Sequence, residues 1–137
     1  MTEGPSLTVF VPGRLVNPLN QRWHWSERAQ WARRWRQNTA LTVGSQRHDV
    51  LIGHGYRQFF TDFVQRPKAI TFVAHVARRF DPDGLAAALK PVLDGLGQGR
   101  ADAKMIVSDG PEAGHKVSYE QILDRRIQGV EITIALL

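Results

Sequence analysis

Two aspartates separated by one residue open the stretch "DPDG", at Asp81 and Asp83. In an extended chain, side chains at positions i and i+2 leave the same face, so these two carboxylates would lie side by side. Magnesium prefers hard oxygen ligands and usually takes a few carboxylates, with water and substrate phosphate completing its octahedron. The pair therefore predicts half of a Mg²⁺ site that acts on a phosphate ester.

A lysine and a third aspartate follow on the helix that is expected to begin at Asp83. Lys90 lies two turns further on, a rise of roughly 10 Å, and helical side chains lean toward the N-terminus, which would aim its ammonium at the carboxylates. Asp94, four residues later, would hold the lysine in place. A simpler interpretation stays open, in which Asp83 is a helix cap, Asp81-Pro82 is a turn, and the lysine and last aspartate form a surface pair.

Charge is divided unevenly along the chain, whose net charge is +5. Residues 1–79 hold 12 Lys or Arg against 4 Asp or Glu, whereas residues 80–137 hold 6 against 9. A basic part beside an acidic part suits a protein that attracts a polyanion and holds a cation against it. The alternative interpretation is an uneven solvated surface without a nucleic-acid partner.

All four tryptophans lie between residues 23 and 35, where they are interleaved with arginines. Trp31 and Trp35 fall on one face of an expected helix and fit a core stripe. Trp23, His24 and Trp25 precede that helix, and an exposed ring among them would be able to stack on an unpaired base. The arginines that we expect to contact DNA phosphates are Arg22, Arg28, Arg33, Arg34 and Arg36.

Length and composition restrict the class of protein. A chain of 137 residues fits a single domain, residues 1–137, that buries roughly two thirds of its unfolded surface. The absence of cysteine excludes a disulfide framework and a thiolate metal site, and it agrees with a cytoplasmic protein. No apolar run approaches the roughly 18 residues of a membrane span, and the start lacks the regions of a signal peptide. We therefore expect a cytoplasmic protein with no membrane partner.

The elements that must position these residues alternate in type. Ser26 is expected to cap the first helix and Gly44 to end it, while the segment 45–68 is left unassigned. This order predicts an α+β fold, a single domain with a mixed β-sheet packed by two main helices. The expected strands are 7–11, 68–80, 104–108, 115–122 and 129–137, and the expected helices are 27–43 and 83–96.

Three short motifs in this order resemble the RusA family of Holliday-junction resolvases, including its phage and prophage members. The motifs are "DPDG", "LKPVLDGL" and Ser108-Asp109 in "IVSDGPE". The family carries D-x-D-N at a strand end, then a helix reading L-K-x-x-x-D-x-L, then D-D before the next strand. The opening "VPGRLVNPLNQRWHWSERAQWARRWRQ" is similar to the family's first strand, Asn-containing loop and basic aromatic helix. The likeness covers most of the chain outside 45–68 and implies a RusA-like fold.

The resemblance implies a Mg²⁺-dependent endodeoxyribonuclease, with Mn²⁺ as a substitute metal. Such an enzyme acts in DNA recombination and repair as a homodimer that resolves Holliday junctions or other branched DNA by paired nicking. Matched residue by residue, Asp81, Asp83 and Asp109 fall at the metal-binding positions, and Lys90 falls at the helix lysine that supports catalysis. The metal would activate a water, and the lysine would steady the transition state at the scissile phosphate.

Two positions depart from the family pattern. Gly84 stands where the family usually has asparagine, and Ser108 replaces the first aspartate of the D-D pair. The glycine-rich link before that pair leaves Asp102 as an alternative to Asp109 for the third ligand. A second hypothesis is therefore a catalytically degenerate RusA-like module that binds DNA junctions, and a third is a structural homodimer whose tryptophan helix is only an interface.

Overall fold

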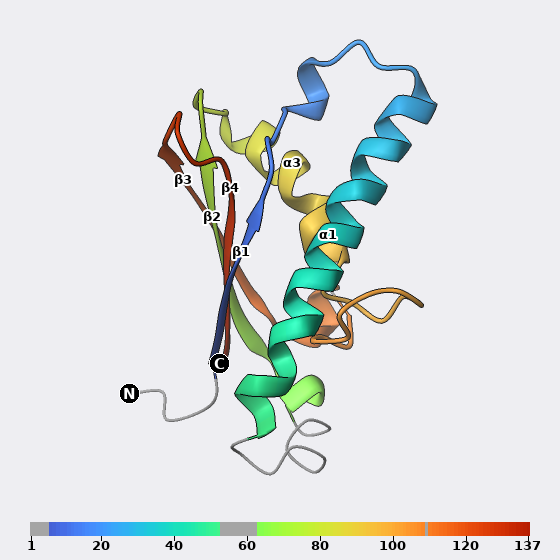
Figure 1. Cartoon of the computed structure of the whole chain (residues 1–137). Coiled ribbons are helices and arrows are strands. Elements are labelled where there is room, and N and C mark those ends of the chain that lie inside the picture. Colours follow the sequence, from blue (N-terminus) through green and yellow to red (C-terminus); the bar gives the residue numbers. More distant parts are fainter. Residues whose placement is uncertain (1–5, 53–62, 109) are drawn as a thin grey trace.

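The computed structural model describes residues 6–52, 63–108 and 110–137. Four strands form one sheet, and the two long helices lie on the same face of it (Figure 1). This architecture confirms the coarser prediction of a single α+β domain with a mixed sheet. The elements are β1 (Ser6–Pro12), η1 (Pro18–Asn20), α1 (Trp25–Ile52), β2 (Lys68–Val76), α3 (Pro82–Asp94), η2 (Pro111–Ala113), β3 (Lys116–Leu123) and β4 (Gly129–Leu136).

The strand order in the sheet is β1-β4-β2-β3. Strand β4 pairs antiparallel with both β1 and β2, whereas β2 and β3 are parallel. Parallel neighbours need a crossover connection, and α3 provides it. The carboxyl ends of β2 and β3 consequently meet at one edge, where the Asp124 N–H donates to the Val76 carbonyl at 2.9 Å. Ligand sites in sheets with such crossovers gather beyond the carboxyl ends of the strands.

Period-two patterning determines which face of the sheet is buried. In β2 the apolar residues at even-numbered positions from Ile70 to Val76 are buried and their neighbours are partly exposed, which is the alternation of a half-buried strand. Helix α3 covers that face with its own apolar stripe, which includes Leu85, Leu89 and Val92. None of the helices in the described part of the chain combines the length and the apolar character that a membrane span requires.

Both predicted boundaries of the first helix are wrong. The helix begins at Trp25, where the ring Nδ1 of His24 accepts from the Ser26 N–H at 3.3 Å, so Ser26 is not the cap. The helix also runs past Gly44 to Ile52, and that glycine does not have the positive φ that a helix-ending glycine adopts. Burial of neighbouring residues such as Val43 outweighs the roughly 1 kcal/mol that a glycine costs within a helix.

Three further element predictions need correction. The third strand of the chain was expected at 104–108, but these residues are irregular, and Lys104 has a φ of 56° that no strand accommodates. Their apolar character reflects burial of Met105 and Ile106 in the core instead of pairing. Strand β2 ends at Val76, short of residue 80. In the unassigned segment, residues 45–52 continue α1, and 53–62 lie outside the described residues.

The N-cap of the second helix lies two residues earlier than predicted. Asp81 is the N-cap of α3, with Pro82 at the first helical position, and Asp83 lies within the first turn. Proline suits that position because its missing N–H would have no partner in the helix. The helix ends at Asp94, two residues before the predicted limit, with Gly95 as its C-cap.

A matched pair of glycine substitutions tests this packing. A Cβ on Gly95 would lie 2.7 Å from the backbone carbonyl oxygen of Arg36, whereas a Cβ on Gly44 would meet nothing within 4 Å. We expect Gly95→Ala to lower the free energy of unfolding by about 1–3 kcal/mol through overpacking between α1 and α3. Gly44→Ala should raise it by about 0.5–1 kcal/mol because alanine favours the helix. Urea unfolding measures both, and shifts in the same direction would contradict the packing described.

Candidate functional site

Asp81 and Asp83 both lie at the start of α3, but only Asp81 is extended, so the extended chain from which side-by-side carboxylates were predicted is absent at Asp83. Asp81 is extended, with φ −70° and ψ 162°, and its Oδ1 accepts from the Gly84 N–H at 2.8 Å. Its carbonyl accepts from the Leu85 N–H at 2.9 Å. Asp83 lies two residues further in the first turn, and both aspartates are exposed. Both residues thus lie at the positive end of the helix dipole.

The segment that leads into Asp81 is fixed by a side chain that the sequence analysis did not single out. The Gln121 side-chain amide, on β3, accepts from the Phe80 N–H at 2.9 Å and donates to the Phe80 carbonyl at 2.8 Å. The residues between β2 and α3 form no strand, so this two-point contact takes the place of sheet pairing there. It ties the approach to the acidic pair directly to the sheet.

Two adjoining hollows lie beside this segment, between it and the loop that follows β1. They share Asn17, Gln21, Arg78 and Phe80. The one that reaches Asp81 has a volume of about 450 Å³, within the range of small-ligand sites. The remaining lining residues are Asn20, Arg79 and Asp81 in this hollow, and Arg14, Leu15, Val16, Ala77 and Gln128 in the other.

The composition of these hollows favours an anionic, hydrogen-bonding ligand. Arg78 and Arg79 are exposed and immediately precede the acidic segment. Guanidinium groups bind phosphate oxygens in a bidentate manner, and amide side chains both donate and accept hydrogen bonds. In the sequence, the only signal for the two arginines was the stretch "RRF" directly before Asp81. A phosphate group bound here would lie next to the carboxylate pair.

The two carboxylates fit a hard divalent cation. One oxygen of Asp81 is used by the cap, but its other oxygen and the Asp83 carboxylate have no hydrogen-bond or ion-pair partner among the described residues. Mg²⁺ commonly binds through one or two carboxylates and keeps several waters. Within the described ranges, no three His, Cys, Asp or Glu side chains come close enough to share a metal ion.

Lys90 lies two turns beyond the acidic pair, and its ammonium is directed the other way. Its Nζ is 3.0 Å from Oδ1 of Asp94, an i,i+4 ion pair with 57% and 32% of the two side chains exposed. This confirms the predicted pairing of the two residues. It also means that the lysine does not reach toward Asp81 and Asp83 in this structure.

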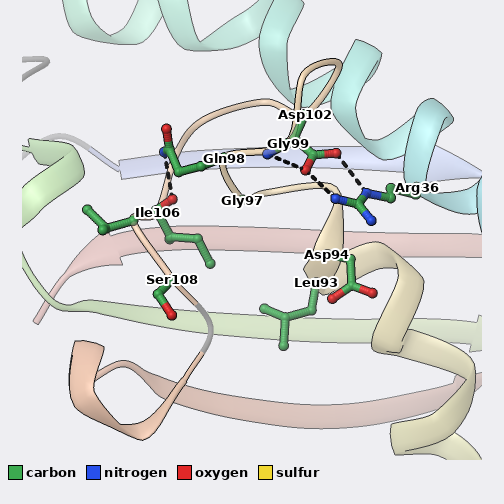
Figure 2. Close-up of a pocket in the computed structure, with 10 residues that line it drawn as sticks. Arg36, Leu93, Asp94, Gly97, Gln98, Gly99, Asp102, Ile106 and Ser108 are labelled. Atoms are coloured by element: carbon green, nitrogen blue, oxygen red, sulfur yellow. Dashed lines mark hydrogen bonds and ion pairs between the residues drawn. The ribbon is translucent and has the colours of Figure 1, made fainter.

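A separate hollow lies at the opposite end of α3 (Figure 2), and it includes the alternative third ligand. Asp102 is bound there by Arg36, with Nε to Oδ1 at 2.9 Å and Nη2 to Oδ2 at 2.6 Å, and its Oδ2 also accepts from the Gly99 N–H at 2.8 Å. The hydrogen bond and charge of Arg36 hold the pKa of the Asp102 carboxyl below its usual range. Asp102 is therefore a structural acid at the α1–α3 contact.

The preferred third ligand, Asp109, lies outside the described residues. Its neighbour Ser108 lines the hollow that contains Asp94 and Asp102, and the Ser108 hydroxyl donates to Glu112 at 2.9 Å. The 13 residues of α3 span roughly 20 Å, so Ser108 and Asp81 lie near opposite ends of this helix. Of the predicted ligands, Asp81 and Asp83 are the two that lie at the start of α3.

The basic aromatic helix divides into exposed and structural members. Arg22, Arg28, Arg33 and Arg34 are exposed, while Arg36 is bound to Asp102. As predicted, Trp35 is buried, and Trp31 packs against the core and, at 5.4 Å between ring centroids, against Trp23. Trp25 is 77% exposed at the first position of α1, with the His24 ring 5.5 Å away.

No protein-family model matches the chain, and no curated protein matches it in sequence. The RusA-like motifs therefore remain a resemblance, and the activity that they imply remains a prediction.

The pH dependence of stability tests the role of Asp102. Because its pKa is lowered in the folded protein, the carboxylate stabilises the fold above the unfolded value of about 3.9 and loses this effect as the pH falls through the lower folded value. We expect Asp102→Asn to lower the free energy of unfolding at pH 7 by about 1–2 kcal/mol, a modest value because Arg36 is half-exposed. Urea unfolding from pH 7 to pH 3 should show the difference from wild type shrinking below pH 4. A difference that is constant over this range would contradict the assignment.

Proposed function

We propose that this protein is a metal-dependent endonuclease that hydrolyses phosphodiester bonds in branched DNA. The observation that carries the proposal is the pair of exposed carboxylates, Asp81 and Asp83, beside a hollow lined by Arg78 and Arg79. Acidic and basic groups in this arrangement suit a metal ion and a phosphate that bind side by side. The RusA-like motifs support the choice of four-way junctions as substrate and of a homodimer as the active form, since a twofold enzyme can nick two symmetric strands.

Each group around the hollow has a task in this proposal. Arg78 and Arg79 bind phosphates that flank the scissile bond, and Asp81 and Asp83 supply oxygen ligands to Mg²⁺ or Mn²⁺. A bound metal of this kind supplies an activated water and neutralises charge on the phosphate. The exposed arginines of α1, Arg28, Arg33 and Arg34, extend the basic surface toward the arms of the junction. The proposed site uses Asp81 and Asp83 alone, because Ser108, the residue next to Asp109, lies near the other end of α3.

Lys90 can take part in this mechanism only if its ammonium leaves Asp94. To support the transition state at the phosphate, its ammonium must exchange Asp94 for a phosphate oxygen. An exposed i,i+4 ion pair of this kind contributes only about 0.3–0.5 kcal/mol to stability. We propose that Asp94 holds the lysine between binding events.

The second candidate function is a junction-binding module without catalysis. It is favoured by the Lys90–Asp94 pair and by the neutral Ser108 hydroxyl, which is bound to Glu112. Such a module would bind four-way junctions with an affinity that falls steeply with salt, because arginines release counterions from the phosphates. It would show no metal-dependent cleavage.

Cleavage of a synthetic four-way junction separates the two candidates. The wild-type chain should nick the junction in Mg²⁺ or Mn²⁺ and leave it intact in EDTA. Asp83→Asn removes a negative ligand and should lower the cleavage rate by about 100-fold or more, the scale on which loss of a preorganised electrostatic group acts. Binding measured in EDTA should change far less.

Glu120→Gln is the matched control for this assay, because Glu120 is an exposed carboxylate on β3, outside both hollows. It should cleave at the wild-type rate. Salt-sensitive binding without metal-dependent cleavage by wild type would assign the junction-binding function instead. An Asp83→Asn variant that cuts as fast as wild type would refute the proposed site.

A further inference from the structure

Gly84, the third residue of α3, is buried, and the side chain of Asn17 occupies the space that a side chain at position 84 would need. A Cβ on Gly84 would lie 2.2 Å from Nδ2 of Asn17 and 2.5 Å from Oδ1 of Asp81. Contacts this short are essentially absent from protein structures, so the glycine permits the approach. The amide of Asn17 and the carboxylate of Asp81 therefore both lie next to the Cα of Gly84, on the side where a Cβ would be.

The orientation of the Asn17 amide is determined by its other end. Its Oδ1 accepts from the Leu19 N–H at 3.0 Å as the N-cap of η1. The amide nitrogen, which can only donate hydrogen bonds, therefore faces Gly84 and Asp81. Asn17 also lines both of the hollows beside the acidic pair. Its donor thus stands where it can hold a carboxylate oxygen.

We infer that Asn17 is a positioning residue for Asp81, and this inference rests on the proposed function of Asp81 as a metal ligand. The Gly84 N–H donates to Oδ1 of Asp81 at 2.8 Å, and the Asn17 amide lies beside the same oxygen, so Oδ2 is the oxygen left for the cation. The RusA resemblance leads to the expectation of an asparagine at position 84. In this chain the amide comes instead from Asn17, in the loop after β1, which lies 67 residues before Gly84 in the sequence.

Groups that orient metal ligands typically change metal affinity by about 10–100-fold when they are removed. Asn17→Ser is the informative substitution, because serine can still cap η1 but has no amide to reach Asp81. A purely structural role at the cap would therefore survive this change. Gly84→Asn added to Asn17→Ser returns an amide to the same space from the helix.

Mn²⁺ binding to the full chain, followed by isothermal titration calorimetry, tests the inference without reference to cleavage. Asp81→Asn should remove the binding and so define the site. Asn17→Ser should weaken Mn²⁺ binding about tenfold, and Asn17→Ser with Gly84→Asn should restore it to near the wild-type value. Asn38→Ala, which removes an exposed amide on α1, is the control and should bind as wild type does.

Binding by wild type that depends on Asp81 but is unchanged in Asn17→Ser would overturn this inference and leave the proposed function standing. A loss that the double variant fails to restore would assign Asn17 a structural role only and would also overturn it. The absence of Asp81-dependent binding in wild type would remove both proposals.

Thermal unfolding tests, without a metal, whether the Asn17 amide occupies the space beside Gly84. Gly84→Ala should lower the melting temperature more in the wild-type background than in the Asn17→Ser background, because only the former holds an amide in the way. Equal shifts in both backgrounds would show that the amide does not occupy this space.

Discussion

The position of α3 on the sheet is the constraint on which the rest of this structure depends. Its apolar stripe, from Leu85 to Val92, is buried in the same core as the helix-facing residues of β2 and β4. Each end of the helix is then fixed by a specific contact. Asp81 caps the start, and Gly95 lies so close to the Arg36 carbonyl that no larger residue fits at the other end. The hollow that reaches Asp81 and the hollow that contains Asp102 are built on these two ends.

The two ends serve different purposes, although both combine arginine with aspartate. At the carboxyl end, Arg36 and Asp102 are bound to each other, so their charges neutralise locally and join α1 to the loop after α3. At the amino end, Arg78 and Arg79 are exposed beside carboxylates that retain free oxygens. Only the second arrangement leaves charge available to a ligand. This difference is why the proposed function is located at the start of the helix.

Asp81 both caps α3 and, in the proposed site, offers an oxygen to the metal ion. A carboxylate at an N-cap is held by the backbone N–H groups at the start of the helix, and Oδ1 of Asp81 is held in this way by the Gly84 N–H. The same cap uses only one of its two oxygens. A helix start can therefore present a charged, oriented oxygen without a folding penalty, provided that the neighbouring side chains leave space for it. Gly84 provides that space.

The sequence predicted the features that depend on local patterning. Runs of apolar and β-branched residues located β1, β2, β3 and β4, and the "DPDG" spacing located the acidic pair. Gly44 did not end the helix because its local cost of about 1 kcal/mol is smaller than the gain from burying residues such as Val43. Ser26 is not the cap because the ring of His24 accepts the Ser26 N–H instead. The contacts of Asn17 with Gly84 and of Gln121 with Phe80 join residues far apart in the chain. A single sequence carries no signal for such pairs, since each partner is an ordinary loop or strand residue by itself.

The location of the metal is the central claim, and affinity cleavage by Fe²⁺ tests it most directly. Fe²⁺ bound in place of Mg²⁺, with ascorbate and peroxide, generates hydroxyl radicals that cut the polypeptide near the ion. The account predicts cuts in two segments, 17–21 and 78–84, which are lost in Asp81→Asn and suppressed by excess Mg²⁺. Cuts confined to 94–108, at the other end of α3, would contradict it.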